Sequence, residues 1–228
     1  MDHNPILCAV DTPDLDRART LIAAVSGAVG GVKLGLEFFA AHGPAGVRMA
    51  AGSKKKLFLD LKLHDIPNTV AGAVRAALAL EPLFLTLHSA GGDAMMRAAV
   101  EARGARRTKL LAVTVLTSLD ASDLAATGQD GPVEAQVRRL ALLAKAAGLD
   151  GVVCSPQEVA LLRQACGKDF LLVVPGIRPA GAALGDQKRV QTPRAAIEAG
   201  ADYLVIGRPI TEAADPVAAA RAIRAEIP

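Results

Sequence analysis

The charged residues with the clearest catalytic potential interrupt a run of leucines. In LFLDLKLHD, residues 57–65, Asp60 and Lys62 occupy alternate positions, and Asp65 follows directly after the run. Ionised side chains in a buried strand raise the free energy of the folded state unless a partner or a reaction requires them. The arrangement therefore favours a site in which carboxylates and an ammonium group act together. The other face of the run is apolar and consists of Leu57, Leu59, Leu61 and Leu63.

Asp60 and Lys62 are two residues apart, so on a strand both side chains project to the same side, about 7 Å apart at the backbone. A structural ion pair is the alternative, but desolvation offsets most of the attraction of a buried pair. With Lys33 and Asp65 the set contains two cations and two anions that can alternate in space. Neighbouring carboxylates favour the charged form of a buried lysine. The set predicts a lysine that stays protonated in a dry pocket and can donate its proton.

A second group of residues has the composition of a phosphate-binding site. Gly207 permits close approach of the backbone to an anion, and Arg208 can bind that anion through two hydrogen bonds. Arg178 and Gln187 lie before and within a polar segment, and we expect them to fold over the same group. A tight turn with a surface arginine is the alternative. The phosphate interpretation predicts a phosphate ester whose reactive part lies near Lys62.

Short β-type runs alternate with Ala- and Leu-rich amphipathic stretches along the chain. Eight such repeats are typical of a closed (β/α)₈ barrel, and we predict an α/β fold with one barrel domain over residues 1–228. An open doubly wound sheet is the alternative, but the first strand is followed by Val10-Asp11-Thr12-Pro13 in place of a glycine-rich turn. The predicted strands are 6–11, 31–35, 57–62, 83–88, 110–116, 151–155, 171–176 and 203–207, and the predicted helices are 14–28, 36–51, 68–80, 93–105, 133–147, 156–166, 192–200 and 215–226.

In such a barrel the active site lies at the C-terminal ends of the strands. Several residues there also have simpler interpretations: Asp11 and Ser155 could cap helices, and His88 could be a core histidine. The segment 177–192, after the seventh strand, is long and mainly small or polar, which is typical of a lid or binding loop. The residues expected at these ends are Asp11, Lys33, Asp60, Lys62, His88, Thr117, Ser118, Ser155, Pro175, Gly176, Ile177, Arg178, Gly207 and Arg208.

The composition excludes several functional classes. The net charge is +3, there is no Trp, and the Lys and Arg residues are dispersed, which argues against a nucleic-acid partner. The three cysteines, Cys8, Cys154 and Cys166, have no metal-ligand spacing, so we expect reduced core thiols and no metal site. No apolar run reaches membrane-spanning length and the N-terminus lacks a signal pattern, which predicts no membrane association and a cytoplasmic location.

With these residues in view, the chain resembles the orotidine 5′-phosphate decarboxylase family. DLKLHDIPNTV (60–70) is similar to its central signature, and AVD (9–11), VKLG (32–35) and TVLTSLD (114–120) are similar to its first, second and fifth strands. GVVCSP (151–156), VPGIRP (174–179), GDQKRV (185–190) and IGRPIT (206–211) follow in the family's order. The resemblance implies cofactor-free decarboxylation of orotidine 5′-monophosphate to UMP.

The resemblance also implies a role for each site residue. Lys62 would be the proton donor, and Asp60 and Lys33 would complete the charged network. Asp65, Ile66 and Thr69 would come from the other subunit of a homodimer. The substrate contacts would be Asp11 and Lys33 on the ribose, Thr117 and Ser118 on the pyrimidine, Pro175 and Asp60 beside them, and Arg178, Gln187, Gly207 and Arg208 on the 5′-phosphate.

Two alternatives stay open from the sequence. A related metal-dependent sugar-phosphate decarboxylase would share the Asp-x-Lys-x-x-Asp core but bind Mg²⁺ through carboxylates such as Glu37 and Asp60. A barrel that binds a phosphate ligand without turnover is the other. The GDQKR and TVLTS motifs argue against the first, and the presence of both Lys62 and Asp60 argues against the second.

Overall fold

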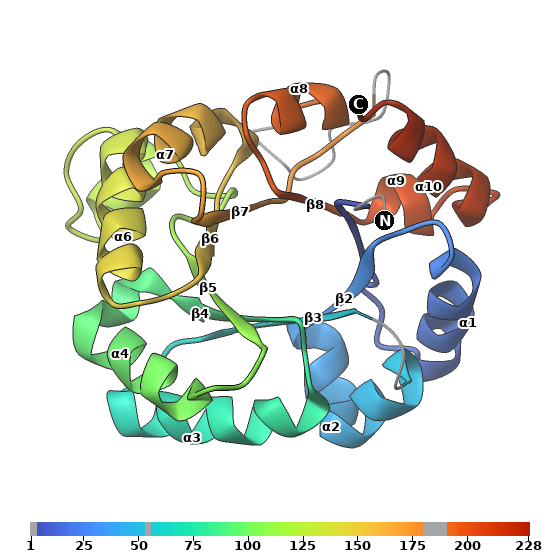
Figure 1. Ribbon diagram of the computed structural model, residues 1–228, viewed down its shortest axis with the longest axis horizontal. Helices are drawn as coiled ribbons and strands as arrows, with labels where there is room; N and C mark the ends of the chain where they lie inside the picture. Colours follow the sequence, from blue (N-terminus) through green and yellow to red (C-terminus); the bar gives the residue numbers. More distant parts are fainter. Residues whose placement is uncertain (1–3, 53–55, 180–190) are drawn as a thin grey trace.

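The structure is a computed structural model that describes residues 4–52, 56–179 and 191–228, and in these ranges eight parallel strands form a closed barrel (Figure 1). The strands are paired in sequence order, and β8 closes the ring against β1. The predicted (β/α)₈ fold is therefore confirmed. The strands are β1 (Ile6–Ala9), β2 (Gly31–Gly35), β3 (Leu57–Leu63), β4 (Phe84–His88), β5 (Lys109–Val113), β6 (Gly151–Val153), β7 (Leu171–Val174) and β8 (Tyr203–Ile206).

A ring of helices covers the outside of the barrel (Figure 1). Their sequences are amphipathic, so one face of each packs on the strands and the other meets solvent. The α-helices are α1 (Leu15–Val25), α2 (Leu36–Ala51), α3 (Pro67–Ala77), α4 (Gly92–Arg103), α5 (Ala121–Ala126), α6 (Val133–Ala146), α7 (Val159–Cys166), α8 (Pro193–Glu198), α9 (Arg208–Thr211) and α10 (Pro216–Ala225). Short 3₁₀ turns are η1 (Leu78–Leu80), η2 (Ser89–Gly91) and η3 (Pro156–Glu158).

The alternation of side chains along each strand separates two cores. Inward-facing residues fill the barrel interior, where Phe58 and Phe84 meet edge to face with ring centroids 5.7 Å apart. Outward-facing residues such as Leu59 and Leu85 join the larger core between strands and helices. Because both faces are buried, the strands are nearly continuous hydrophobic runs, as expected for a parallel sheet.

The predicted strands and helices match the observed ones apart from their ends. Strands β1, β5, β6 and β7 end two or three residues earlier than predicted. Two short helices, α5 and α9, were not predicted; they lie within the loops after β5 and β8.

Strand β3 has one irregularity that bears on the site. Its pairing with β4 runs from Leu59 opposite Leu85 to Leu63 opposite Leu87, so residues 60–62 of β3 face a single residue of β4. Lys62, within this bulge, has a φ of +50°. Residues other than glycine rarely adopt this left-handed conformation, and those that do are found in turns, as Glu81 is here, and at functional sites.

Two aspartates tie the N-terminal ends of the strands together. Asp150, just before β6, accepts hydrogen bonds from the backbone N–H of Leu110 and from Arg103. Asp202, just before β8, does the same with the backbone N–H of Leu172 and with Arg163. This end of the barrel thus carries stabilising contacts, as is usual for the face opposite the active site.

The three cysteines are free and buried, as predicted for core thiols. Burial, with the negative charge of Asp11 nearby, raises the pKa of the Cys8 thiol to about 12. Burial also raises the pKa of Cys166. In the part of the chain that the structure describes, no helix combines the length and apolar character needed to cross a membrane.

Candidate active site

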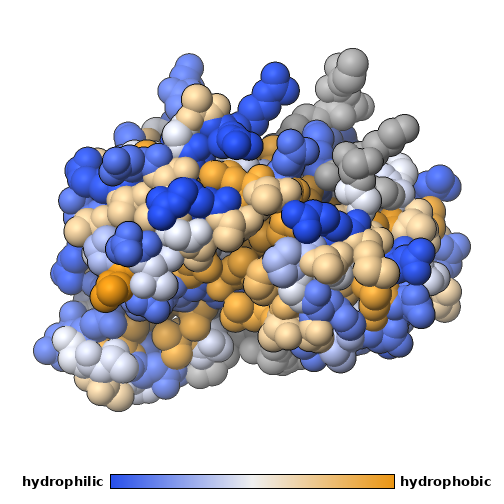
Figure 2. Space-filling model, turned by 90° about the horizontal axis from the view of Figure 1, so that it is seen from below, coloured by the Kyte–Doolittle hydropathy of each residue, from blue (hydrophilic) through white to orange (hydrophobic). Residues whose placement is uncertain are grey.

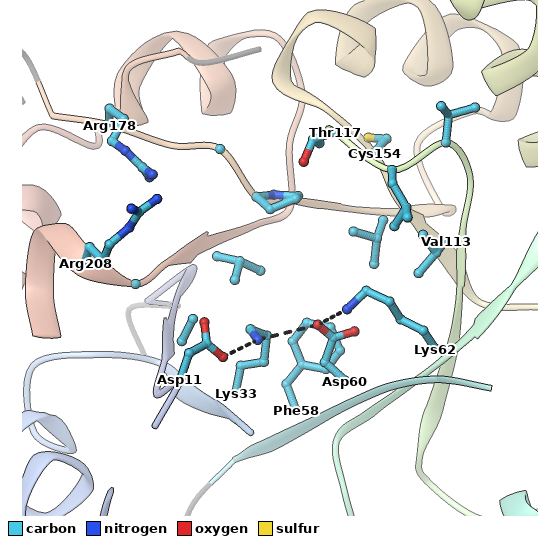
Figure 3. A pocket seen from close by; sticks show the side chains of 18 of the residues that line it. Asp11, Lys33, Phe58, Asp60, Lys62, Val113, Thr117, Cys154, Arg178 and Arg208 are labelled. Carbon is cyan, nitrogen blue, oxygen red and sulfur yellow. Dashed lines mark hydrogen bonds and ion pairs between the residues drawn. The ribbon is translucent and has the colours of Figure 1, made fainter. Parts of the chain in front are cut away.

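A cavity of about 500 Å³ opens at the C-terminal ends of the strands (Figure 3). Its lining includes most of the residues that the sequence predicts for the site: Asp11, Lys33, Asp60, Lys62, Thr117, Pro175, Arg178, Gly207 and Arg208. Strand ends far apart in the sequence thus converge on one cavity, as the barrel topology requires.

A row of alternating charges crosses the floor of the cavity (Figure 3). The Lys33 ammonium lies 3.0 Å from Oδ1 of Asp11 and 3.5 Å from Oδ2 of Asp60. The Lys62 ammonium lies 2.7 Å from the same Asp60 oxygen. One carboxylate oxygen is therefore shared by two ammonium groups, which confirms the predicted proximity of Asp60, Lys62 and Lys33.

Burial and charge oppose each other at the centre of this row. Lys33 is 8% exposed and Asp60 is 7% exposed. Burial alone would raise the pKa of Asp60, but the charges of Lys33 and Lys62 outweigh it and the pKa lies below its ordinary value. Burial likewise opposes the charged form of Lys33, but Asp60 and Asp11 outweigh it and raise the Lys33 pKa. Both groups are ionised at neutral pH.

Gly35, two residues after Lys33 on β2, leaves space for the ion pair between Lys33 and Asp11. A Cβ atom at Gly35 would lie 3.2 Å from the Lys33 ammonium nitrogen and 3.3 Å from Oδ1 of Asp11. Any side chain at this position would crowd the ion pair. The glycine, whose pairing partner on β3 is Asp60, keeps space for the charges to meet.

Two arginines form the other side of the cavity. Arg178 and Arg208, from the segments after β7 and β8, point toward one another (Figure 3). Burial, and then the charge of Arg208, lower the pKa of the Arg178 guanidinium. Two cations face to face repel each other, so a dianion between them would be strongly favoured. Gln187, predicted for the same group, lies outside the described residues.

The upper wall of the cavity is apolar, and the sequence prediction missed it. The apolar lining contains Val113, Val115, Leu116, Val153 and Cys154, together with Phe58, Val205 and Ala9. These residues look like ordinary strand residues, and only the inward positions of the strands could have singled them out. Thr117 lies on this wall beside Cys154 (Figure 3), whereas Ser118 is exposed and does not line the cavity.

Three predicted residues lie outside the cavity of their own chain. Asp65, Ile66 and Thr69 are exposed at the rim after β3. The Asp65 carboxylate accepts a hydrogen bond from the backbone N–H of Ile66 at 2.6 Å, and within the described ranges no ion pair joins Asp65 to Lys62. The predicted network therefore forms in this chain without Asp65.

His88 and Ser155 also lie apart from the cavity lining. His88 ends β4, half-buried, with its ring 5.4 Å from that of His64. Burial, and then the charges of His64 and Lys62, lower the His88 pKa. Ser155 is the buried N-cap residue of η3, where its backbone N–H donates to the Glu158 carboxylate, but within the described residues its hydroxyl has no hydrogen-bond partner.

Thr86, on β4, is a polar site residue that the sequence prediction overlooked. Its hydroxyl donates to Oδ1 of Asp60 at 2.9 Å and accepts from the backbone N–H of Lys62 at 2.9 Å. Threonine is common on strands, so no pattern in the sequence distinguishes this one.

The Mg²⁺ site of the metal-dependent alternative does not form in this arrangement. Glu37 is exposed on the first turn of α2 and lies outside the cavity lining, and both oxygens of Asp60 already accept hydrogen bonds from Thr86 and Lys62. Across residues 4–52, 56–179 and 191–228, no group of three or more His, Cys, Asp or Glu side chains is placed to hold a metal ion.

Comparison with known proteins gives consistent matches over nearly the whole chain. Residues 4–223 match the model of the Orotidine 5′-phosphate decarboxylase / HUMPS family. The chain is 57% identical over 224 residues to the orotidine 5′-phosphate decarboxylase of Thermobifida fusca, covering 98% of this chain and 95% of that protein. It is 55% identical over 235 residues to that of Rhodospirillum rubrum, covering 100% and 95%. The crystal structure of orotidine 5′-phosphate decarboxylase from Lactobacillus acidophilus superposes with a TM-score of 0.85 at 39% identity, covering 98% of both chains.

The lowered pKa of Asp60 predicts a pH dependence of stability. Because the folded-state pKa lies below the ordinary 3.8, the unfolded chain binds more protons in this range, and the stabilisation by Asp60 is complete above pH 3.8 and lost below it. We expect Asp60→Asn to lower the free energy of unfolding by about 3 kcal/mol at pH 7. Thermal unfolding followed by circular dichroism should show that the gap in Tm between the native protein and Asp60→Asn narrows below pH 3.8. A gap that is constant from pH 7 to pH 2.5 would contradict the assignment.

Proposed function

The chain belongs to the orotidine 5′-phosphate decarboxylase family, and from that membership we propose how its residues carry out the reaction. The protein converts orotidine 5′-monophosphate to UMP in pyrimidine biosynthesis, which makes it a carboxy-lyase. The observation that carries the proposal is the position of the Lys62 ammonium, 2.7 Å from Asp60 and across one cavity from two arginines (Figure 3).

Lys62 stabilises the charge that develops during decarboxylation. When the bond from C6 to the carboxylate breaks, CO₂ departs and the electron pair stays on C6, where no adjacent carbonyl can delocalise it. An ammonium group fixed beside C6 lowers the energy of this carbanion and then donates its proton to C6. Lys62 recovers a proton from solvent after UMP leaves. The chemistry uses an amine of the protein in place of an electron-sink cofactor.

Asp60 holds the Lys62 ammonium in a fixed direction, and Lys33 holds Asp60. The Asp60 carboxylate is held by Lys33 and Thr86, so it can orient Lys62 without moving itself. Such preorganised charge is effective because no reorganisation is needed as the reaction proceeds. Asp11 and Lys33, paired at 3.0 Å, bind the ribose hydroxyls beside this group.

The two arginines bind the 5′-phosphate. A phosphate dianion between Arg178 and Arg208 removes the repulsion between them and accepts hydrogen bonds from both. Gly207 and the loop that contains Gln187 complete this subsite. Binding energy from the non-reacting phosphate then orders the closed site and excludes water from C6.

The apolar wall receives the pyrimidine ring. Val113, Val153 and Leu116 offer an apolar surface, and Thr117 supplies a hydroxyl at the edge of the ring. Pro175 closes the side next to the phosphate subsite. An apolar surround strengthens the electrostatic effect of Lys62 on C6.

The working form is a homodimer in which each site takes residues from both chains. Leu36 is 54% exposed and Ile66 is 67% exposed, at the C-terminal ends of the neighbouring strands β2 and β3. The face that carries α2, α3 and α4 shows apolar side chains gathered across its middle (Figure 2). Contiguous exposed apolar surface favours association. Asp65, Ile66 and Thr69 then reach the partner's cavity, where Asp65 adds the fourth charge beside Lys62.

Domain organisation and location complete the proposal. We assign residues 1–228 to one barrel domain, which is supported by the pairing of the first strand with the last. We assign the protein to the cytoplasm, which is consistent with free and buried cysteines.

Replacing the proposed proton donor should abolish the reaction. We expect Lys62→Ala to fold, because the side chain is 28% exposed at the rim, and to lose at least about 10³-fold in kcat. The assay is the fall in ultraviolet absorbance of orotidine 5′-monophosphate with EDTA present. Native activity in EDTA also excludes the metal-dependent and the catalytically silent alternatives. The control is Lys168→Ala, at an exposed position between α7 and β7, and turnover near the native rate in Lys62→Ala would refute the role.

Removing one phosphate ligand should weaken binding. We expect Arg208→Ala to raise KM about 10²-fold with the fold intact, since a charge-assisted bidentate contact is lost. Steady-state kinetics measure this, and Arg194→Ala, exposed on α8, is the matched control. An unchanged KM in Arg208→Ala would contradict the phosphate assignment.

Mixing two inactive variants tests whether the site is shared. If Asp65 acts in the partner's site, a heterodimer of Lys62→Ala and Asp65→Asn has one site with both changes and one native site. After denaturation and joint refolding at equal amounts, we expect about a quarter of native activity, since half of the dimers are mixed. If Asp65 acts within its own chain, the mixture stays as inactive as its components.

A further inference from the structure

Thr86 occupies an unusual place among the buried residues. It is 0% exposed and lies on β4, two residues after Phe84, so it points into the barrel below the catalytic charges. It does not line the cavity and contacts no substrate position. Its hydroxyl nevertheless uses both its donor and its acceptor capacity on two residues of the charged row, Asp60 and Lys62.

The Thr86 hydroxyl lies at the point where the regular pairing between β3 and β4 is interrupted. Residues 60–62 of β3 face Thr86 alone on β4, so the backbone N–H of Lys62 is not part of the regular ladder. That N–H donates to the Thr86 hydroxyl at 2.9 Å. A buried backbone N–H requires a partner, and here a side chain supplies it. The left-handed turn at Lys62, with φ +50°, is thereby held in place.

The same hydroxyl also orients the carboxylate. It donates to Oδ1 of Asp60 at 2.9 Å, which leaves Oδ2 directed at the ammonium groups of Lys62 and Lys33. Bulges next to active sites redirect side chains in this way. A single oxygen atom thus fixes the backbone from which Lys62 projects and the carboxylate that receives its ammonium group.

We propose that Thr86 is a positioning residue for decarboxylation, which holds Lys62 and Asp60 in the relative orientation that the reaction requires. This inference rests on the roles proposed for those two residues. Without the hydroxyl, the Lys62 ammonium is free to move relative to C6. Misplacement of a catalytic group by about 1 Å can lower the rate by about 10²-fold.

The test compares three single substitutions. Thr86→Val keeps the volume and removes the hydroxyl, Thr86→Ser keeps the hydroxyl, and Thr108→Val is the control. Thr108 is also a buried threonine, 4% exposed, whose hydroxyl donates to the carbonyl of Pro82 at 2.7 Å, but it lies at the N-terminal end of β5. We expect Thr86→Val to lose about 10²-fold in kcat with KM within about threefold of native. Thr86→Ser should recover most of kcat, and Thr108→Val should lower Tm without lowering kcat.

Several outcomes would overturn the inference. Native kcat in Thr86→Val would do so, as would an equal loss of kcat in Thr108→Val, because the effect would then follow general loss of stability. A low kcat in Thr86→Ser would show that the methyl group matters instead. If Thr86→Val does not fold, Thr86→Ala takes its place, since alanine also lacks a hydroxyl; native kcat in that variant would again contradict the role.

The inference and the proposed function fail separately. If Lys62→Ala retains turnover, the proposed role of Lys62 is wrong and Thr86 has no catalytic partner to position. If Lys62→Ala is inactive while Thr86→Val has native kcat, the reaction assignment stands and only the role of Thr86 is lost.

Discussion

The structure depends on one carboxylate that is shared by two ammonium groups. Asp60 is buried, and burial alone would raise its pKa, but Lys33 and Lys62 outweigh burial and lower it. The lysines in turn would not stay in a dry cavity without Asp60. Each group therefore makes the others possible, and the barrel supplies the frame in which they meet. Removing Asp60 leaves two ammonium groups without their shared carboxylate, which links the stability of this end of the barrel to its chemistry.

The two ends of the barrel use charge for different purposes. At the N-terminal ends of the strands, Asp150 and Asp202 bind an arginine and a backbone N–H each, so these two carboxylates are satisfied within the fold. At the C-terminal ends, Arg178 and Arg208 face one another and Lys62 points into a cavity. The first arrangement stabilises the chain as it is. The second directs charge into a cavity, as we expect where part of the binding energy is realised only with a ligand in place.

The sequence allowed much of this to be predicted, for physical reasons that particular residues illustrate. The strands could be recognised because they are buried on both faces, and Asp60 and Lys62 stood out because charge in such a run is rare. The bulge at Lys62 could not be predicted, since it depends on the register between β3 and β4. Thr86 and the apolar wall were missed for a related reason: their residue types are ordinary for strands, and only the closed barrel gives them a role. Asp65 belongs to a third case, because its predicted partner lies in another chain.

The bulge explains how a strand can bring an acid and an amine two residues apart into direct contact. On a regular strand the Cα atoms of such residues are about 7 Å apart and both side chains run parallel, so an ion pair at 2.7 Å would leave the amine directed along the sheet. Turning the backbone at Lys62 lets its side chain leave the strand at a different angle, with the ammonium group beside Asp60 and still facing the cavity. The strained residue lies in the strand, while Arg178 and Arg208, proposed for the phosphate, come from the segments after β7 and β8. Precision is thus required where the electron pair develops on C6, and it is supplied by the most rigid part of the fold.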